Sequence, residues 1–160
     1  MTSPRRPARR RAATAAAAPP IESPGRGVLL DTGVRVALYA RNDPAHDRAV
    51  RWMTPFQGTL HTVEPVLTET AWFLSPRTRI VLAELAARGT FQVHHPDAAG
   101  YARIAALARI YADQDPDWAD LTLVWLAESI GIASIATLDV ADFSVYRING
   151  RKRFELELLR

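Results

Sequence analysis

The sequence contains no cysteine, which excludes disulfide bonds, cysteine–zinc sites and thiol nucleophiles. It also lacks any apolar run approaching the roughly 20 residues that a membrane-spanning helix needs. An alanine run within residues 1–20 is too polar, and is broken too soon by Pro19 and Pro20, to form the core of a signal peptide. We therefore expect a cytoplasmic protein without a membrane segment.

Most of the chain also lacks an excess of positive charge, although its net charge is +3. Residues 1–26 carry six arginines and one acid, Glu22, whereas residues 27–160 contain two more acids than bases. Basic charge across the whole domain therefore gives no argument for nucleic-acid binding.

Residues 1–26 consist mainly of Arg, Ala, Pro, Ser and Thr. Such a segment buries too little apolar surface to offset its ordering entropy, so we predict a disordered tail. Three interpretations of it stay open: a solvated tail, an extension from an upstream start codon, or a basic arm that contacts RNA. Residues 27–160 are long enough for one domain with its own core.

Strand and helix signals alternate along that domain. Strands are expected at residues 28–30, 58–61, 90–94, 132–137, 145–148 and 154–158. Helices are expected at residues 34–40, 44–53, 64–74, 79–88, 96–112 and 118–130. Strands separated by helices of roughly 10–15 residues imply a parallel sheet with helices on both faces. The predicted fold class is α/β, with three α/β/α layers around a central, mainly parallel sheet.

Five acidic residues stand where such a fold would bring them together. Asp31 directly follows a buried strand, and Asp139 comes two residues after the strand ending at Thr137. In parallel α/β sheets, ligands bind outside the carboxyl ends of the strands. Glu69 lies on an otherwise apolar helix, and Asp117 and Asp120 share one face at the start of another.

Each acid also has a simpler interpretation. Asp31 and Asp117 are good helix N-caps, Glu69 could be a solvated helix residue, and Asp139 could belong to a turn. The joint pattern is what favours a site, because clustered carboxylates repel one another unless a cation neutralises them. Oxygen ligands without cysteine or paired histidines suit Mg²⁺ or Mn²⁺. Metal-assisted phosphodiester hydrolysis is the corresponding chemistry.

Four segments resemble the PIN-domain family and, within it, the VapC-type toxins of bacterial toxin–antitoxin systems. They are Val28-Leu29-Leu30-Asp31-Thr32-Gly33, Leu67-Thr68-Glu69-Thr70-Ala71, Asp117-Trp118-Ala119-Asp120-Leu121-Thr122-Leu123-Val124 and Ile135-Ala136-Thr137-Leu138-Asp139-Val140-Ala141-Asp142-Phe143. The resemblance covers about residues 27–150, and the last two segments are the most specific.

The resemblance implies a PIN-like nuclease domain whose metal site is made by Asp31, Glu69 and Asp120, with Asp139 as the fourth acid. Asp117 would bind a second ion or orient water, and Thr137 would place a hydroxyl near the metal. The resemblance further implies an Mg²⁺- or Mn²⁺-dependent endoribonuclease, an RNA substrate, a small antitoxin protein as partner, and a homodimer.

Other assignments stay open at the level of sequence. Arg35 and Arg147 could hold RNA phosphate, although a solvated arginine is the better interpretation of each. The triplet Asp31-Thr32-Gly33 also occurs in aspartic proteases, but their fold is almost entirely β and this chain is mainly helical. A non-catalytic RNA-binding module and a metal-dependent DNase are the remaining alternatives.

Overall fold

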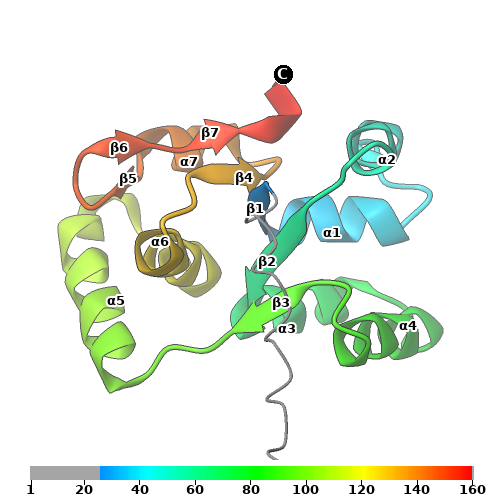
Figure 1. Ribbon diagram of the computed structural model, residues 1–160, viewed down its shortest axis with the longest axis horizontal. Coiled ribbons are helices and arrows are strands. Elements are labelled where there is room, and N and C mark those ends of the chain that lie inside the picture. Colours follow the sequence, from blue (N-terminus) through cyan, green and yellow to red (C-terminus); the bar gives the residue numbers. More distant parts are fainter. Residues whose placement is uncertain (1–25, 160) are drawn as a thin grey trace, which may run out of the picture.

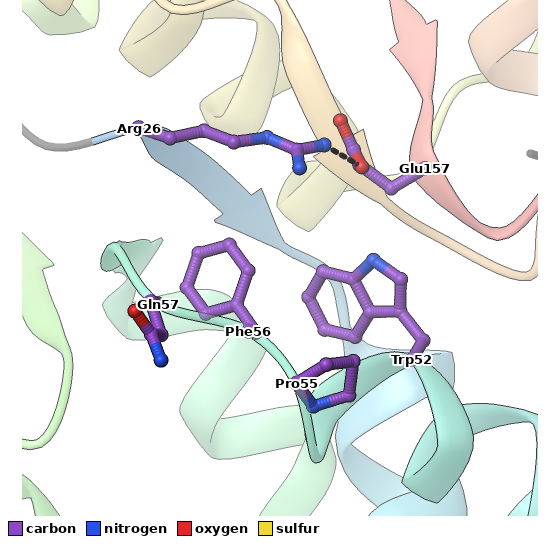
Figure 2. Close-up of a pocket in the computed structure, with 6 residues that line it drawn as sticks. All are labelled: Arg26, Trp52, Pro55, Phe56, Gln57 and Glu157. Carbon is purple, nitrogen blue, oxygen red and sulfur yellow. Dashed lines mark hydrogen bonds and ion pairs between the residues drawn. The ribbon is translucent and has the colours of Figure 1, made fainter.

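The computed structural model describes residues 26–159, and the predicted tail lies almost wholly outside the described residues. Arg26, assigned to that tail, belongs instead to the folded domain. Its carbonyl accepts a hydrogen bond from the Thr59 amide, and its guanidinium pairs with the buried carboxylate of Glu157 (Figure 2).

The central sheet is entirely parallel, as predicted, and it is covered by helices on both faces (Figure 1). Its strand order is β3-β2-β1-β4-β7. The strands are β1 (Gly27–Leu30), β2 (Thr59–Val63), β3 (Gln92–His94), β4 (Ser134–Ala136) and β7 (Glu155–Leu156). A separate antiparallel hairpin pairs β5 (Arg147–Ile148) with β6 (Lys152–Arg153).

The helices form the two outer layers, with short 3₁₀ turns at Ala112–Gln114 and Glu157–Leu159. They are α1 (Thr32–Tyr39), α2 (His46–Met53), α3 (Glu64–Phe73), α4 (Pro76–Ala87), α5 (Ala98–Ile110), α6 (Trp118–Ile130) and α7 (Val140–Val145). No helix within residues 26–159 is long and apolar enough to cross a membrane.

Alternation along the strands divides the core into two. Val28 and Leu30 of β1 pack in the cluster that α1, α2 and α4 cover, whereas Leu29 packs in the cluster covered by α5 and α6. Helix α6 is buried along much of its length, because eight of its residues are buried. This burial fixes the depth and rotation of α6, and therefore the position of Asp120 on its first turn.

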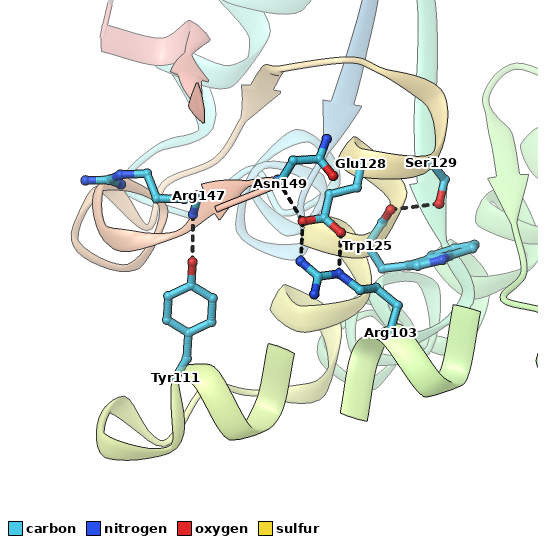
Figure 3. Close-up of polar contacts among 7 residues, drawn as sticks. All are labelled: Arg103, Tyr111, Trp125, Glu128, Ser129, Arg147 and Asn149. Carbon is cyan, nitrogen blue, oxygen red and sulfur yellow. Dashed lines mark hydrogen bonds and ion pairs between the residues drawn. The ribbon is translucent and has the colours of Figure 1, made fainter. Parts of the chain in front are cut away.

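A bidentate ion pair joins α5 to α6, the two helices that cover the core cluster containing Leu29. Arg103 donates from Nε and Nη2 to the two carboxylate oxygens of Glu128, at 2.7 and 2.8 Å. The same carboxylate accepts a hydrogen bond from the backbone N–H of Asn149, in the hairpin turn (Figure 3). One side chain thus ties α6 to both α5 and the hairpin.

Two element predictions were wrong in detail, and one helix was missed. Helix α4 begins at Pro76 rather than Arg79, because Ser75 caps it and proline is tolerated in a first turn. Helix α7 was not predicted, since its six residues are too few to show a helical period. The expected strand 145–148 is reduced to Arg147–Ile148, and it pairs outside the main sheet.

Candidate active site

The two strand-end aspartates meet because β1 and β4 are neighbours in the sheet. Leu30 pairs with Ala136, and the Asp31 amide donates to the Ala136 carbonyl at 3.1 Å. The chain leaving β4 then runs through Thr137 to Asp139 beside Asp31. The carboxyl edge of the sheet is therefore where the acids gather, as the parallel topology predicts.

All five predicted acids line one cavity of about 390 Å³ at this edge. Its lining residues are Asp31, Thr32, Gly33, Glu69, Asp117, Asp120, Leu138 and Asp139. They come from α1, α3, the start of α6 and the loop after β4, so segments far apart in the sequence form its wall. The structure thus brings together the residues that the sequence pattern had grouped.

Asp31 is held by hydrogen bonds on both of its oxygens. Oδ1 accepts from the Thr32 amide at 2.6 Å as the N-cap of α1, and Oδ2 accepts from the Thr137 hydroxyl at 2.7 Å. The Thr137 hydroxyl in turn accepts from the Asp139 amide at 2.9 Å. Burial raises the pKa of Asp31 to about 6, although the Thr137 and Thr32 hydrogen bonds act in the opposite direction. Thr137 therefore orients a carboxylate within the cavity.

Asp120 is 5% exposed and is the most perturbed acid of the site. Burial, and then the negative charges of Asp117 and Asp31, raise its pKa to about 8. The hydroxyl of Tyr146 donates to its Oδ2 at 3.2 Å and partly offsets that rise. The sequence analysis did not single out Tyr146, because a lone tyrosine after a short helix carries no motif.

Glu69 and Asp117 form the more open side of the cavity. Glu69 accepts from the Thr32 hydroxyl at 2.8 Å, and burial raises its pKa. Asp117 is exposed and caps α6 by accepting from the Asp120 amide at 2.8 Å. Its capping role is confirmed, and it is compatible with lining the cavity because only one carboxylate oxygen is used.

Asp139 is likewise an N-cap, with Oδ1 accepting from the Asp142 amide at 3.0 Å. The helix it caps is α7, so it initiates a helix rather than standing in an isolated turn. Asp31, Asp117 and Asp139 thus each serve the start of a helix while facing the same cavity.

The chemistry of this donor set fits a hard divalent cation. Its charged side chains are all carboxylates, and burial raises the pKa values of Asp31, Glu69 and Asp120. A cation would relieve both the repulsion and the desolvation. Across residues 26–159, no three Asp, Glu or His side chains already surround a single point as ligands. An open wall of carboxylates suits Mg²⁺, which keeps several waters and uses few protein ligands.

The two arginines considered as phosphate ligands lie in different surroundings. Arg35 has no exposed surface, and its guanidinium carbon lies 3.9 Å from the centre of the Phe91 ring. It is therefore neither solvated nor placed to contact RNA. Arg147 is partly exposed, and its Nη1 donates to the carbonyls of Ser144, Val145 and Tyr146 at the end of α7. Figure 3 shows this guanidinium on the far side of its strand from the Glu128 carboxylate.

A larger cavity, of about 510 Å³, lies elsewhere and does not contain the acidic cluster. It adjoins the start of β1, opposite to the carboxyl edge, where the rings of Trp52 and Phe56 stack at 5.4 Å. The acid at its wall, Glu157, is the partner of Arg26 (Figure 2). Its residues therefore offer no cluster of metal ligands.

Comparison with known proteins gives a consistent result. A family model described as "PIN domain" matches residues 28–148. No match was found among curated proteins. Among solved structures, the chain is similar to Mycobacterium tuberculosis VapC20, described as a sarcin–ricin loop cleaving toxin. That similarity has a TM-score of 0.68 at 18% identity, and it covers 76% of this chain and 97% of that one.

Proposed function

Because the chain belongs to the PIN-domain family, we propose that it is a divalent-metal-dependent endoribonuclease and the toxin component of a toxin–antitoxin pair. The observation that carries this proposal is the convergence of Asp31, Glu69, Asp117, Asp120 and Asp139 on one cavity. Structural similarity to a protein described as a sarcin–ricin loop cleaving toxin supports RNA as the substrate class.

In this proposal, Asp31, Glu69 and Asp120 hold Mg²⁺ or Mn²⁺, while Asp139 and Asp117 complete the acidic wall. When bound, such an ion would activate a water and stabilise charge on the phosphate oxygens. Thr137 and Tyr146 position the carboxylates of Asp31 and Asp120 through their hydroxyl groups. Asp117 and Asp139 are exposed, so they are the acids best placed to meet an incoming strand or to orient water.

The antitoxin and the homodimer belong to the same proposal. Large apolar side chains are exposed on α3 and α4, with Trp72 80% and Phe73 67% exposed. Exposed apolar patches of this kind are typical of protein interfaces. They support a protein partner without identifying which partner covers them.

The test is cleavage of an RNA that contains both hairpin and single-stranded segments, with Mg²⁺ or Mn²⁺ added to tag-free protein. We expect cleavage by the wild type, loss of activity in Asp31→Asn, Glu69→Gln and Asp120→Asn, and full activity in the exposed control Asp47→Asn on α2. Excess EDTA should stop the reaction, and Mg²⁺ should restore it.

Three outcomes would contradict the proposed function. Wild-type turnover by Asp120→Asn would remove the acidic site from the mechanism. Binding of RNA without cleavage in either metal would favour a non-catalytic RNA-binding module. Preferential digestion of a DNA strand of the same sequence would favour a metal-dependent DNase. Identical purification of Asp120→Asn controls for contaminating ribonuclease.

A further inference from the structure

Two histidines form a second cluster of possible metal ligands, away from the carboxylate cavity. His61 lies on β2 and His94 on the edge strand β3. The strands are paired in parallel register, with His61 opposite Gln92 and His94 opposite Val63. The two histidines are therefore diagonal neighbours on one face of the sheet.

Their ring nitrogens are close enough to share a proton or an ion. His61 Nδ1 and His94 Nε2 are 3.0 Å apart, and the ring centres are 5.2 Å apart with a 40° tilt. With metal–nitrogen bonds of about 2.0–2.1 Å, two ligands at angles of about 90–109° are about 2.9–3.4 Å apart. The observed separation lies within that range.

We propose that His61 and His94 bind a divalent transition ion of the Zn²⁺, Ni²⁺ or Cu²⁺ class. Neutral imidazole suits these ions, whereas Mg²⁺ prefers oxygen ligands, so the two sites would select different metals. Burial lowers the pKa of both histidines. Repulsion by His94 lowers the pKa of His61 further, and repulsion by His95 lowers that of His94, so the rings favour the neutral form that binds metal.

Ion binding at this pair needs no loss of a proton from the neutral protein. Without metal, one ring donates its N–H to the other across the 3.0 Å gap. On binding, that proton moves to the second nitrogen of the same ring, which leaves both facing nitrogens as ligands. Glycine at residue 27 leaves space for two neighbouring side chains: a Cβ there would clash with Ile132 Cδ1 and would lie 3.3 Å from His61 Nε2.

The histidine pair would be open to solvent and would bind the ion with moderate affinity. Both histidines are partly exposed, so water can reach them. Within residues 26–159, no third His, Asp or Glu completes the ligand set, and water would fill the remaining positions. A bound ion would also tie the edge strand β3 to β2, and would therefore raise the thermal stability of the folded protein.

The test is calorimetric titration of tag-free, full-length protein with Zn²⁺, carried out on wild type, His61→Ala, His94→Gln and the control His46→Gln. His46 is partly buried, and its Nδ1 donates to the carbonyl of Ala37 at 2.7 Å. We expect an affinity loss of at least tenfold in each variant of the pair and none in the control. Zn²⁺ should raise the melting temperature of wild type and His46→Gln, but not of His94→Gln.

A spectroscopic measurement identifies the ligands independently of stability. Cu²⁺ bound to wild type should show electron-spin coupling to two imidazole nitrogens, and this signal should be lost in His94→Gln. Equal Zn²⁺ binding by wild type and by both variants of the pair would overturn the proposal, as would no Zn²⁺ binding by folded wild type. Neither result depends on ribonuclease activity, so failure here is distinguishable from failure of the proposed function.

Discussion

Replacing Asp120 by Asn should stabilise the metal-free protein while abolishing its activity. The Asp120 carboxyl has a pKa of about 8 in the folded chain and an ordinary value of 3.8. Between these values the unfolded chain carries the charge and the folded chain carries the proton. The native state therefore binds more protons, and its stability falls as the pH rises from about 4 to about 8.

The magnitude follows from the same two values. One pKa unit corresponds to about 1.4 kcal/mol, so this carboxyl costs the fold at most about 3 kcal/mol at pH 6 and about 6 kcal/mol at pH 9. Local relaxation reduces both figures. Asparagine is isosteric, removes the charge, and retains an oxygen that can accept from Tyr146. We expect a gain of about 1–3 kcal/mol that is larger at pH 9 than at pH 6.

The assay is urea unfolding in excess EDTA at both pH values, followed by tryptophan fluorescence. Asp47→Asn, an exposed substitution of the same chemistry, is the matched control and should change stability little. The reasoning would be refuted if Asp120→Asn were less stable than wild type, or if its advantage were the same at pH 6 and pH 9. Added Mg²⁺ should stabilise wild type and leave the variant nearly unchanged.

Three further predictions concern single side chains. Tyr146→Phe removes a hydrogen bond that lowers the pKa of Asp120, so the pH at which Mg²⁺ binding reaches half its maximum should rise; an unchanged or lower midpoint would contradict this role. Arg35→Met replaces a buried guanidinium that has no hydrogen-bond partner within the described residues. We therefore expect urea unfolding to show equal or greater stability, by up to about 1–4 kcal/mol. A marked loss of stability would contradict the absence of a partner. Gly131→Ala should cost about 1 kcal/mol in the same assay, because residue 131 ends α6 at a φ of 72° with no steric obstacle to a Cβ; no loss would mean that the helix end rearranges.

The edge of the sheet that carries the site could be predicted from the sequence, because the direction of parallel strands determines it. Asp31 and Asp139 follow buried strands, and parallel strands place their carboxyl ends on one edge. Asp120 could be located because the apolar spacing of its helix fixes which face is buried. These inferences needed only periodicity and topology.

What the sequence could not predict depended on packing between distant segments. The tyrosine that contacts Asp120 sits 26 positions further along the chain, and it is placed there by edge-to-face packing against Tyr111 and Phe143. Arg35 was assigned to the surface because arginine usually is exposed, yet the rotation of α1 turns it inward onto Phe91. Neither contact has a local signature.

The five acids of the site differ in how well their surroundings stabilise their negative charge. Asp31, Asp117 and Asp139 each cap a helix, so backbone amides and the positive end of the helix stabilise their charge. Asp120 lies inside the first turn of α6 and is held by its buried position and one tyrosine hydroxyl. Capping thus lets the fold keep three carboxylates at the cavity through contacts that also stabilise helices. The uncompensated charge falls mainly on Asp120, which is therefore the acid whose ionisation should depend most strongly on a bound cation.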